Sequence, residues 1–502
     1  MSPPGNRRLQ RCNMDRIINA DRLTGHGNIK GREFAAQIID AGMSAGNPYY
    51  NVKRLIRVVD GALSFNDPLM VLRGDPAGGA AIYNLDGIDR IYIFAVGKGM
   101  QYPVRALEEV LGDLITGGLV ICKHGDAQVC EKLPVVYGGH PIPDRNAIEG
   151  CARILEIAKS ANFTERDLVI SVMGSGIGSL CTLPAEGISL DDVERYNYLC
   201  QIDKGMPTGD LSFIRNQIDR IKGGRFTRAM QPARMVNLIS GGSSMAARSY
   251  DEVVTRNTWI HSLPDGTTTE GAIAAAKKWG VWDTLPRSIV KKLESNPPGG
   301  DTLSAGEFEK YDIRVFCVVP TELNALATAR RKAEELGFKT VLMTEFTGCE
   351  ASAVGVFMGQ VALNCAKKGE PFKAPVAIFT AGELITTVAG EGGVGGTNQE
   401  YCLAAAGIIK GNDKIVIAAV DTDGTDGPGG DFHFGASASG INVLAGGMVD
   451  GFTLGEAEQK GVDIFSSLKK HDSSAALWEL DSGIAAKQNI SVGDLHCVLV
   501  ME

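Results

Sequence analysis

Short apolar runs in the first half of the chain each end in a glycine-rich loop, and a helical pattern follows. Three such runs are Ile91–Val96, Leu168–Met173 and Met235–Ile239. Apolar runs of this length that end at turn residues are typical of buried strands. Buried strands that alternate with helices predict a doubly wound parallel sheet with helices on both faces. The sequence therefore predicts an α/β fold.

The second half shows a similar alternation, with a strand pair at its centre. The pattern predicts strands at Val376–Thr380 and Leu384–Val388, with Glu383 in the turn between them, and a helix at Tyr401–Ile409. A further buried strand, Ile415–Val420, follows that helix.

With 502 residues the chain is too long for one hydrophobic core, so we expect two domains. Residues 1–30 are polar and contain glycine, and they are predicted to form a loose tail. The segment Ser295–Asp301 (SNPPGGD) is the best candidate for the linker between the two domains. The predicted domains are residues 30–295 and residues 301–502, with the option that the last strand of the second returns to the first.

Charge and cysteine content restrict the class of function. The net charge of -9 predicts no basic surface for nucleic acid or for an anionic membrane. No apolar run approaches the length that spans a bilayer, and the N-terminus lacks the apolar segment of a signal peptide. The 11 cysteines include no CxxC pair, which favours reduced thiols and a cytoplasmic protein.

Three aspartates crowd the loop after the strand Ile415–Val420. Asp421, Asp423 and Asp426 are interleaved with glycine and threonine. An open α/β sheet binds its ligand at the carboxyl ends of its strands, and Mg²⁺ takes a few carboxylates while it keeps room for phosphate oxygens. The loop therefore predicts a magnesium and phosphate site. The alternative is a surface loop in which each aspartate forms an Asx-turn or caps a helix.

Two glycine-rich loops in the first half have the chemistry of anion sites. Gly97–Met100 (GKGM) joins a strand to a helix and would aim N–H groups and the Lys98 ammonium at one point. The loop Gly174–Leu180 (GSGIGSL) can form a nest of N–H groups for phosphate or carboxylate. The alternatives are an ordinary strand–helix turn around Lys98 and a plain tight turn at the second loop.

A small basic cluster stands out in this acidic chain. It comprises Arg215, Arg220, Lys222 and Arg225 and ends near the pair Gly223-Gly224. It is either a solvated face or a source of positive charge for a nearby anion. His140, in the loop GGHPIPD, is more often a structural histidine than a catalytic one at such a position.

These segments, taken in order, resemble the class II glycerate 2-kinases over roughly residues 33–500. The resemblance rests on AVGKGM (95–100), GHPIPD (139–144), LPAEGISL (183–190), IRNQIDRIKGGRF (214–226), GE (382–383), GGTNQE (395–400), DTDGTDGP (421–428) and GDLHCVLV (493–500). It implies a Rossmann-like α/β/α N-terminal domain and a mixed α/β C-terminal domain of the MOFRL type.

The resemblance also implies an activity and a set of residues. The activity is transfer of the ATP γ-phosphoryl group to the 2-hydroxyl of D-glycerate, with Mg²⁺, in the cleft between the domains. The implied catalytic residues are Lys98, Glu383, Asp421, Asp423 and Asp426, with Asp421 and Asp423 as metal ligands. Phosphate and substrate are expected on Gly174, Ser175, Gly176, Gly178, Ser179, Arg215, Lys222, Arg225, Thr397 and Asn398. The expected partners are a nucleotide and a small hydroxy acid, and a homodimer is one option for the assembly.

The chain departs from the family pattern at three places. Ile177 stands where the family loop has a glycine, and Thr397 replaces an arginine thought to act at the reacting phosphate. The segment after the fifth strand reads SGGSS (240–244) and then HSLPDG (261–266). Loss of an arginine in phosphoryl transfer removes a charge that stabilises the transition state.

Three functions are consistent with this sequence. The first is a kinase for glycerate or a related small 2-hydroxy acid. The second is an NAD(P)H-dependent hydroxypyruvate reductase, although no GxGxxG fingerprint with a downstream acidic residue follows a strand. The third is a non-kinase descendant that keeps the fold and a ligand site, and Thr397 and Ile177 are its motivation.

Overall fold

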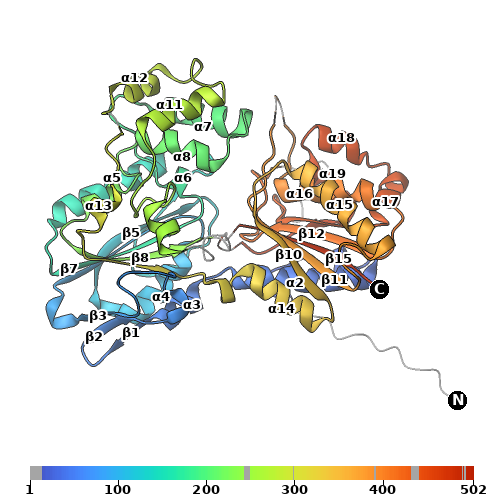
Figure 1. Cartoon of the computed structure of the whole chain (residues 1–502), viewed down its shortest axis with the longest axis horizontal. Coiled ribbons are helices and arrows are strands. Elements are labelled where there is room, and N and C mark those ends of the chain that lie inside the picture. The colour runs from blue at the N-terminus through green and yellow to red at the C-terminus, as the bar shows by residue number, and fades with distance from the viewer. Residues whose placement is uncertain are drawn as a thin grey trace.

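The computed structural model describes residues 14–241, 249–297, 299–388, 390, 392–430, 440–488, 490 and 493–502. These residues form two α/β units, each built on a six-stranded sheet. Figure 1 shows the first unit at the left, in blue to yellow, and the second at the right, in yellow to red. The predicted α/β fold with two domains is confirmed.

The first sheet has the strand order β6-β5-β4-β7-β8-β9, and each pair of neighbours is parallel. Its strands are β4 (Arg90–Val96), β5 (Ile115–Lys123), β6 (Val135–Gly138), β7 (Asp167–Gly174), β8 (Arg234–Ser240) and β9 (Ile313–Cys317). The chain starts at β4, adds strands on one side and then resumes at β7 on the other side. The order reverses between β4 and β7, and such a point is where doubly wound sheets bind their ligands.

Helices and a small sheet cover the first sheet. One face packs on α3 (Tyr49–Leu55), α4 (Gln101–Leu111) and the antiparallel strands β1 (Ile56–Val59), β2 (Ala62–Phe65) and β3 (Ala81–Asn84). The other face packs on α5 (Arg145–Ala161), α6 (Ile177–Leu180), α9 (Arg225–Ala229) and α13 (Ala305–Phe308). A separate helical layer with its own core comprises α7 (Leu190–Asn197), α8 (Thr208–Gln217), α11 (Thr269–Lys278) and α12 (Arg287–Ser295). Figure 1 shows this layer at the top of the first unit.

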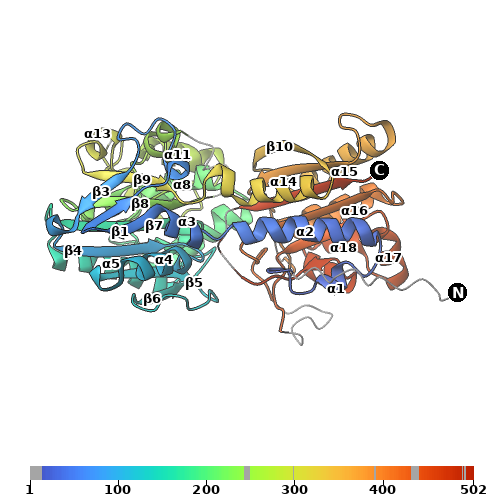
Figure 2. The same cartoon turned by 90° about the horizontal axis from the view of Figure 1, so that it is seen from below.

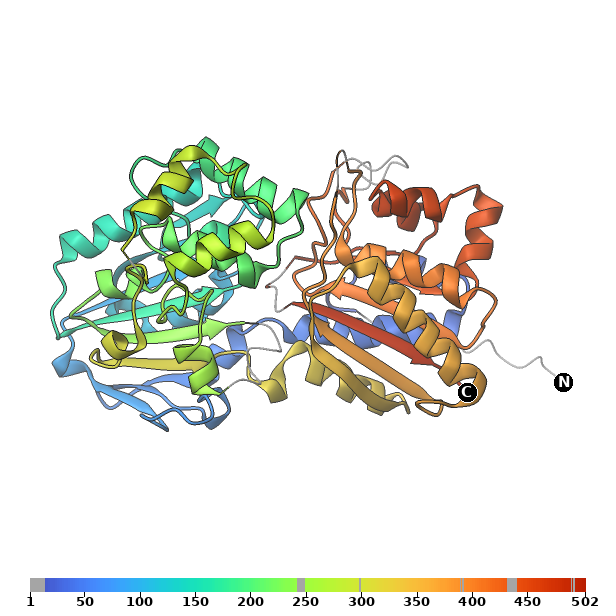
Figure 3. The same ribbon diagram turned by 45° about the horizontal axis from the view of Figure 1, so that its top comes forward.

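The second sheet is mixed, with the order β10-β11-β15-β12-β13-β14. Its strands are β10 (Lys339–Thr347), β11 (Val376–Gly382), β12 (Ile415–Asp421), β13 (Gly446–Asp450), β14 (Gly483–Ile484) and β15 (Asp494–Val500). The C-terminal strand β15 lies between β11 and β12 and is antiparallel to both. Figure 3 shows this red strand inside the second sheet.

The position of β15 corrects two expectations. The last strand stays in the second sheet and does not return to the first. The predicted strand Leu384–Val388 is wrong: only Ile385 forms an isolated bridge, to Glu350. The place beside β11 that this strand would take is already filled by β15.

Helices cover both faces of the second sheet. One face packs on α2 (Ile29–Ala45) and α14 (Ala325–Glu335), which lie side by side in Figure 2. The other face packs on α15 (Ala351–Lys368), α16 (Thr397–Ile409), α17 (Thr453–Lys460), α18 (Ile464–Lys469) and α19 (Ser473–Glu479).

The chain crosses between the two units twice, which differs from the single predicted boundary near residue 300. Helix α2 packs on the second sheet although it precedes every strand of the first. Strand β9, which follows the predicted linker, pairs with β8 in the first sheet. The linker itself packs on the first unit, where Asp301 pairs with Arg225. Apolar periodicity shows that an element is buried but not which sheet buries it.

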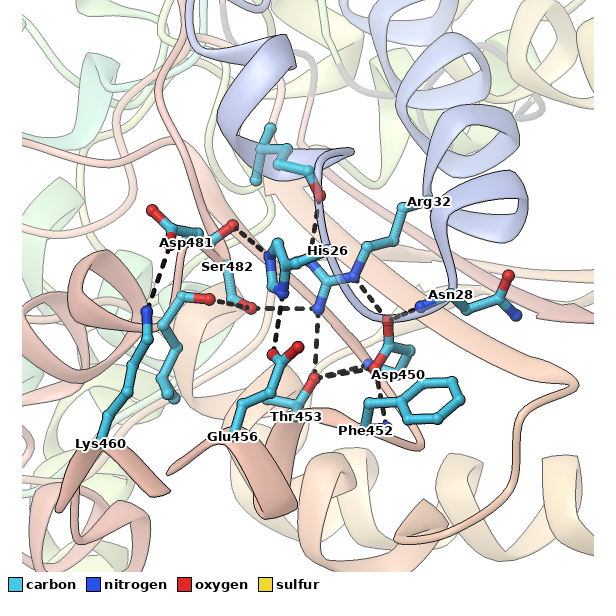
Figure 4. Close-up of polar contacts among 12 residues, drawn as sticks. His26, Asn28, Arg32, Asp450, Phe452, Thr453, Glu456, Lys460, Asp481 and Ser482 are labelled. Atoms are coloured by element: carbon cyan, nitrogen blue, oxygen red, sulfur yellow. Dashed lines mark hydrogen bonds and ion pairs between the residues drawn. The ribbon is translucent and has the colours of Figure 1, made fainter. Parts of the chain in front are cut away.

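The N-terminal segment is also better ordered than the predicted loose tail, for the part from residue 14 onward. Arg16 is buried and donates to the carbonyls of Met43 (2.7 Å) and Lys487 (2.6 Å). Figure 4 shows Arg32 on α2 paired with Asp450 at the end of β13, with an Nε to Oδ2 distance of 2.6 Å. These contacts hold the start of the chain against the second unit.

No helix among the described residues is long and apolar enough to cross a membrane. The ten described cysteines are free, and all but Cys349 are buried.

Candidate active site

Two loops meet at the point where the order of the first sheet reverses. The Lys98 N–H donates to the carbonyl of Ser175 (2.8 Å), so the loop after β4 lies against the loop after β7. At Gly176, whose φ is +80°, a Cβ would lie 2.9 Å from Cγ of Lys98 and 3.0 Å from Cδ2 of His140. The structure thus brings together Lys98 and the loop Gly174–Ser179, and adds His140.

Arg215 lies beside the same loop. A Cβ at Gly178 would overlap Nη1 of Arg215, so only glycine allows this approach. The guanidinium donates to Asn197 Oδ1 (2.8 Å) and Gln201 Oε1 (2.9 Å), which are neutral acceptors. Arg215 is buried and forms no ion pair with the described carboxylates. Its charge is therefore available to an anion on the Gly174–Ser179 loop.

Two other members of the basic cluster are placed differently. Lys222 is buried and pairs with Asp219 (Nζ to Oδ2 3.0 Å). Arg225 pairs with Asp301 and donates to the carbonyl of Asn216 (2.7 Å). Both side chains stabilise the turn between α8 and α9, and neither has an unpaired charge to offer a substrate. The two residues stay predictions as substrate ligands, without geometric support.

The aspartates after β12 face Lys98 from the second unit. Lys98 Nζ lies 2.8 Å from Oδ2 of Asp423 and 3.5 Å from Oδ2 of Asp421. Lys123, at the end of β5, lies 3.7 Å from Asp423 and donates to Thr425 Oγ1 (2.8 Å). Two carboxylates of one unit and two ammonium groups of the other therefore form one charged cluster.

The two aspartates of this cluster have different proton affinities. Burial and the charge of Asp423 raise the pKa of Asp421 to about 6, against the opposing effect of Lys98. Burial would also raise the pKa of Asp423, but Lys98 and Lys123 outweigh it and hold that pKa below its ordinary value. Burial would lower the pKa of Lys98, whereas the two aspartates raise it above its ordinary value. Asp423 and Lys98 are thus charged at neutral pH, and Asp421 is the group that titrates near neutrality.

Asp426 has a different position from its two neighbours. Its carboxylate accepts hydrogen bonds from the N–H groups of Asn398 (3.2 Å) and Gln399 (2.9 Å), in the first turn of α16. Thr397 Oγ1 also donates to it (3.2 Å). Asp426 therefore caps α16 in the way an N-cap side chain does. Thr397 and Asn398 are held by this contact at the start of the helix.

Asp494 is a site residue that the sequence interpretation did not single out. It lies directly opposite Asp421 in the β12–β15 pairing and accepts from Asn398 Nδ2 (2.8 Å) and the Leu384 N–H (2.7 Å). Burial and the charge of Asp421 raise its pKa well above the ordinary value. The motif GDLHCVLV contained this residue, but only the sheet register shows that it faces Asp421. Lys123 was missed because its partners, Asp423 and Thr425, belong to the other unit, whereas His140 was interpreted as a structural histidine.

Glu383 follows β11 and is exposed, with its N–H donating to the carbonyl of Thr347 (2.8 Å). Its carboxylate acts on Lys98 through space and helps to raise the pKa of that lysine. It therefore lies at the rim of the charged cluster.

The donor set of the cluster fits magnesium with substrate oxygens as further ligands. Asp421 and Asp423 supply hard carboxylate oxygens, and Mg²⁺ uses one or two protein carboxylates beside phosphate and water. No group of three or more His, Cys, Asp or Glu side chains that could hold a metal ion by itself occurs in the described part of the chain. A site with one or two protein carboxylates is consistent with both observations.

Family models match both units of the chain. The model described as a domain of unknown function (DUF4147) matches residues 34–294, and the MOFRL family model matches residues 376–490. The fold and these matches define a two-domain α/β protein of the MOFRL-containing class.

Named relatives are similar over most of the chain. A glycerate 2-kinase of Pyrococcus horikoshii is 29% identical over 89% of this chain and 92% of its own length. A D-glycerate 2-kinase of Thermotoga maritima is 30% identical over 78% of this chain and 85% of its own length. The crystal structure of a glycerate kinase of Thermotoga maritima superposes with a TM-score of 0.67 and 26% identity, over 93% of this chain and 99% of that one. The chain belongs to the glycerate 2-kinase family.

Proposed function

We propose that this protein transfers the γ-phosphoryl group of magnesium-bound ATP to the 2-hydroxyl of D-glycerate or a related small hydroxy acid. The contact between Lys98 and Asp423, which joins the loops of the two units, is the observation that carries the proposal. Phosphoryl transfer depends mainly on positioning and charge neutralisation, and this contact brings the phosphate-type loops of one unit to the acidic loop of the other. The names of the relatives support glycerate as the substrate.

The phosphates would lie on the first unit. The loop Gly174–Ser179 offers backbone N–H groups, and Lys98 offers an ammonium group beside them. Arg215, expected to bind phosphate or substrate, lies against Gly178 and so would serve an anionic group bound to this loop. The ring of His140 packs beside the Lys98 side chain against Gly176.

The acidic loop would supply the metal ligand and the base. Asp423, which stays ionised beside two lysines, would hold magnesium, and Asp421 would stay free of the metal to act as the base. Magnesium, when bound, neutralises charge on the phosphate oxygens. Asp421, with its pKa raised to about 6, is suited to accept the proton of the attacking hydroxyl near neutral pH. Glu383 at the rim would orient the hydroxy acid.

Thr397 replaces the arginine expected at the reacting phosphate, and its hydroxyl is bonded to Asp426. Lys98 and Lys123 would then carry the charge neutralisation, since both approach Asp423. Buried, free cysteines support the proposed cytoplasmic location.

A coupled ADP-release assay with magnesium-ATP and a panel of small hydroxy acids, D-glycerate among them, tests the proposal. Release that depends on one acid is the expected result, and the same reactions with NADH or NADPH and hydroxypyruvate should show no nucleotide oxidation. The Asp423→Asn protein serves as the inactive control, because its carboxylate is the one shared by both lysines. Absence of ADP release with every acid, from folded protein, would leave a non-kinase function on this fold.

A further inference from the structure

A hollow of about 550 Å³ lies in the helical layer above the first sheet. Its lining includes Ile142, Arg195, Tyr198, Leu199 and Thr284. Ligand pockets for small molecules have volumes of roughly 300–1,000 Å³. The hollow is therefore large enough for a heteroaromatic base with its sugar.

The chemistry of the hollow suits a flat, neutral, aromatic group. Its surface is mostly apolar, and Tyr198 in its lining is 54% exposed to solvent. The lining also contains two carboxylates, of Glu194 and Asp203, and one guanidinium, of Arg195, so it carries more negative than positive charge. Two carboxylates disfavour a small organic anion such as a hydroxy acid, but they can accept hydrogen bonds from an exocyclic amino group. Aromatic side chains bind bases of any kind by stacking.

Two short chain segments contribute to the hollow and also contact the phosphate-type loop or Arg215 beside it. Tyr198 begins the π-helical turn η4 (Tyr198–Asp203), and Gln201 of that turn accepts a hydrogen bond from Arg215 (2.9 Å). Arg215 in turn lies against Gly178. Ile142 is two residues beyond His140, whose ring lies against Gly176. Several residues that line the hollow therefore lie, along the chain, within three positions of residues that contact Arg215 or the loop Gly174–Ser179. π-turns are frequent at functional sites.

The lining of the hollow comes from segments on both sides of the point where the strand order reverses. Ile142 follows β6, whereas Arg195, Tyr198 and Leu199 lie in the chain between β7 and β8. Doubly wound sheets bind their ligands at the reversal point. Phosphates on the Gly174–Ser179 loop would direct the rest of a nucleotide past Arg215 toward this lining.

We propose that this hollow binds the nucleobase and ribose of the nucleotide, with the base stacked on Tyr198 and Arg215 placed along the phosphate chain. This inference rests on the proposed kinase function, since it extends the same site from the phosphates to the base.

The test compares the binding of magnesium-ATP with that of magnesium-tripolyphosphate, which lacks base and sugar, by calorimetry on the full-length protein. Tyr198→Ala should weaken ATP binding roughly 10-fold, the effect of losing one stacked base, and should leave tripolyphosphate binding unchanged. Thr284→Trp, which fills the hollow, should weaken ATP binding at least as much. Tyr198→Phe should bind ATP like the wild type, because it keeps the stacking ring.

Tyr50→Ala is the matched control, because it removes an aromatic ring that is 74% exposed in α3, away from the hollow. It should change neither affinity. ATP affinity that is unchanged in both Tyr198→Ala and Thr284→Trp would overturn the inference and leave the proposed kinase function standing. Equal weakening of ATP and tripolyphosphate would also overturn it, because it would show a disturbed phosphate loop. Failure of the wild type to bind either compound would overturn the proposed function itself, and the inference with it.

Discussion

Two buried ion pairs, Arg32 with Asp450 inside the second unit and Lys98 with Asp423 between the units, differ in the groups that surround them. Arg32 and Asp450 are fully buried, and Arg32 also donates to the carbonyl of Leu23 and to the hydroxyls of Thr453 and Ser482. Lys98, in contrast, is shared by Asp421 and Asp423, and a second ammonium group lies 3.7 Å from Asp423. The first pair joins two elements of one unit, and the second joins loops of two units.

The difference separates a structural contact from a ligand site. Apart from Asp450, the described groups that accept a hydrogen bond from Arg32 are neutral (Figure 4). Lys98, Lys123 and the Asp421–Asp423 pair come from three separate loops and approach one another, and each group can exchange a charged partner for phosphate or metal. Buried ion pairs contribute little net stability but cost much when half of the pair is removed. The Arg32 pair should therefore govern stability, and the Lys98 cluster should govern turnover.

The largest expected effect is on stability at the structural pair. Arg32→Met leaves the Asp450 carboxylate buried without its partner and should lower the free energy of unfolding by about 3–5 kcal/mol. Urea denaturation followed by circular dichroism measures this loss. Arg166→Met, which breaks an exposed pair with Asp89 (2.6 Å), is the control and should hardly move the midpoint. Equal midpoints for both variants would show that the buried pair of Arg32 contributes no more to stability than an exposed pair.

The next effect is on turnover at the shared lysine. Lys98→Ala removes the ammonium group that faces both carboxylates and the phosphate loop. We expect kcat to fall by about 10²–10³-fold, the cost of one preorganised charge-stabilising group. The urea midpoint should fall less than in Arg32→Met, because Lys123 still lies 3.7 Å from Asp423. Lys132→Ala, at an exposed lysine paired with Asp113 (2.8 Å), is the matched control. An unchanged kcat in the Lys98 variant would exclude this lysine from the reaction.

Asp265 extends the comparison to a buried carboxylate without an ion pair among the described residues. It accepts a hydrogen bond from Asn216 (3.0 Å), and burial raises its pKa to about 6. A raised pKa means that the folded state binds the proton more tightly than the unfolded state, so stability is lost as pH rises from about 4 to about 6. The loss should amount to about 3 kcal/mol.

Asp265→Asn tests this pH dependence, because the amide does not titrate. Urea unfolding between pH 4 and pH 7 should show a smaller decline in this variant than in the wild type. Asp113→Asn, at an exposed carboxylate, is the control and should follow the wild-type curve. Parallel curves for wild type and Asp265→Asn would show that Asp265 titrates normally.

The smallest effect is expected at Thr397. Its hydroxyl donates one of several hydrogen bonds that Asp426 accepts. Thr397→Ala should cost about 1 kcal/mol of stability and change kcat less than threefold, because the side chain serves the helix cap. A loss of turnover as large as that of Lys98→Ala would instead place Thr397 at the reacting phosphate.

Much of the first sheet could be predicted from the sequence, because buried parallel strands are short apolar runs that end in glycine. The loops around Lys98 and Gly174 could each be predicted as an anion site. Their contact could not, because it depends on β4 and β7 being neighbours, and strand order is not visible in local periodicity.

Charged residues were harder to assign than glycines. Asp426 follows Asp423 by three residues, but the turn between them directs it to α16, away from Lys98. Lys222 carries the positive charge expected of a phosphate ligand, but its ion pair with Asp219 neutralises that charge. The sequence shows a charged side chain but not its partner, and the partner determines whether the charge is available to a ligand. For the same reason Asp494 could be assigned only from the strand register, and Lys123 only from its contact with Asp423.

The central claim is that Lys98 and Asp423 act as one unit across the two halves of the molecule. A double-mutant cycle with Lys98→Met and Asp423→Asn, measured as kcat/KM for magnesium-ATP with D-glycerate, tests it most directly. Residues that act together give non-additive losses, so the double variant should lose little more than the worse single variant. Losses that multiply would show that the two groups act independently and would contradict the account.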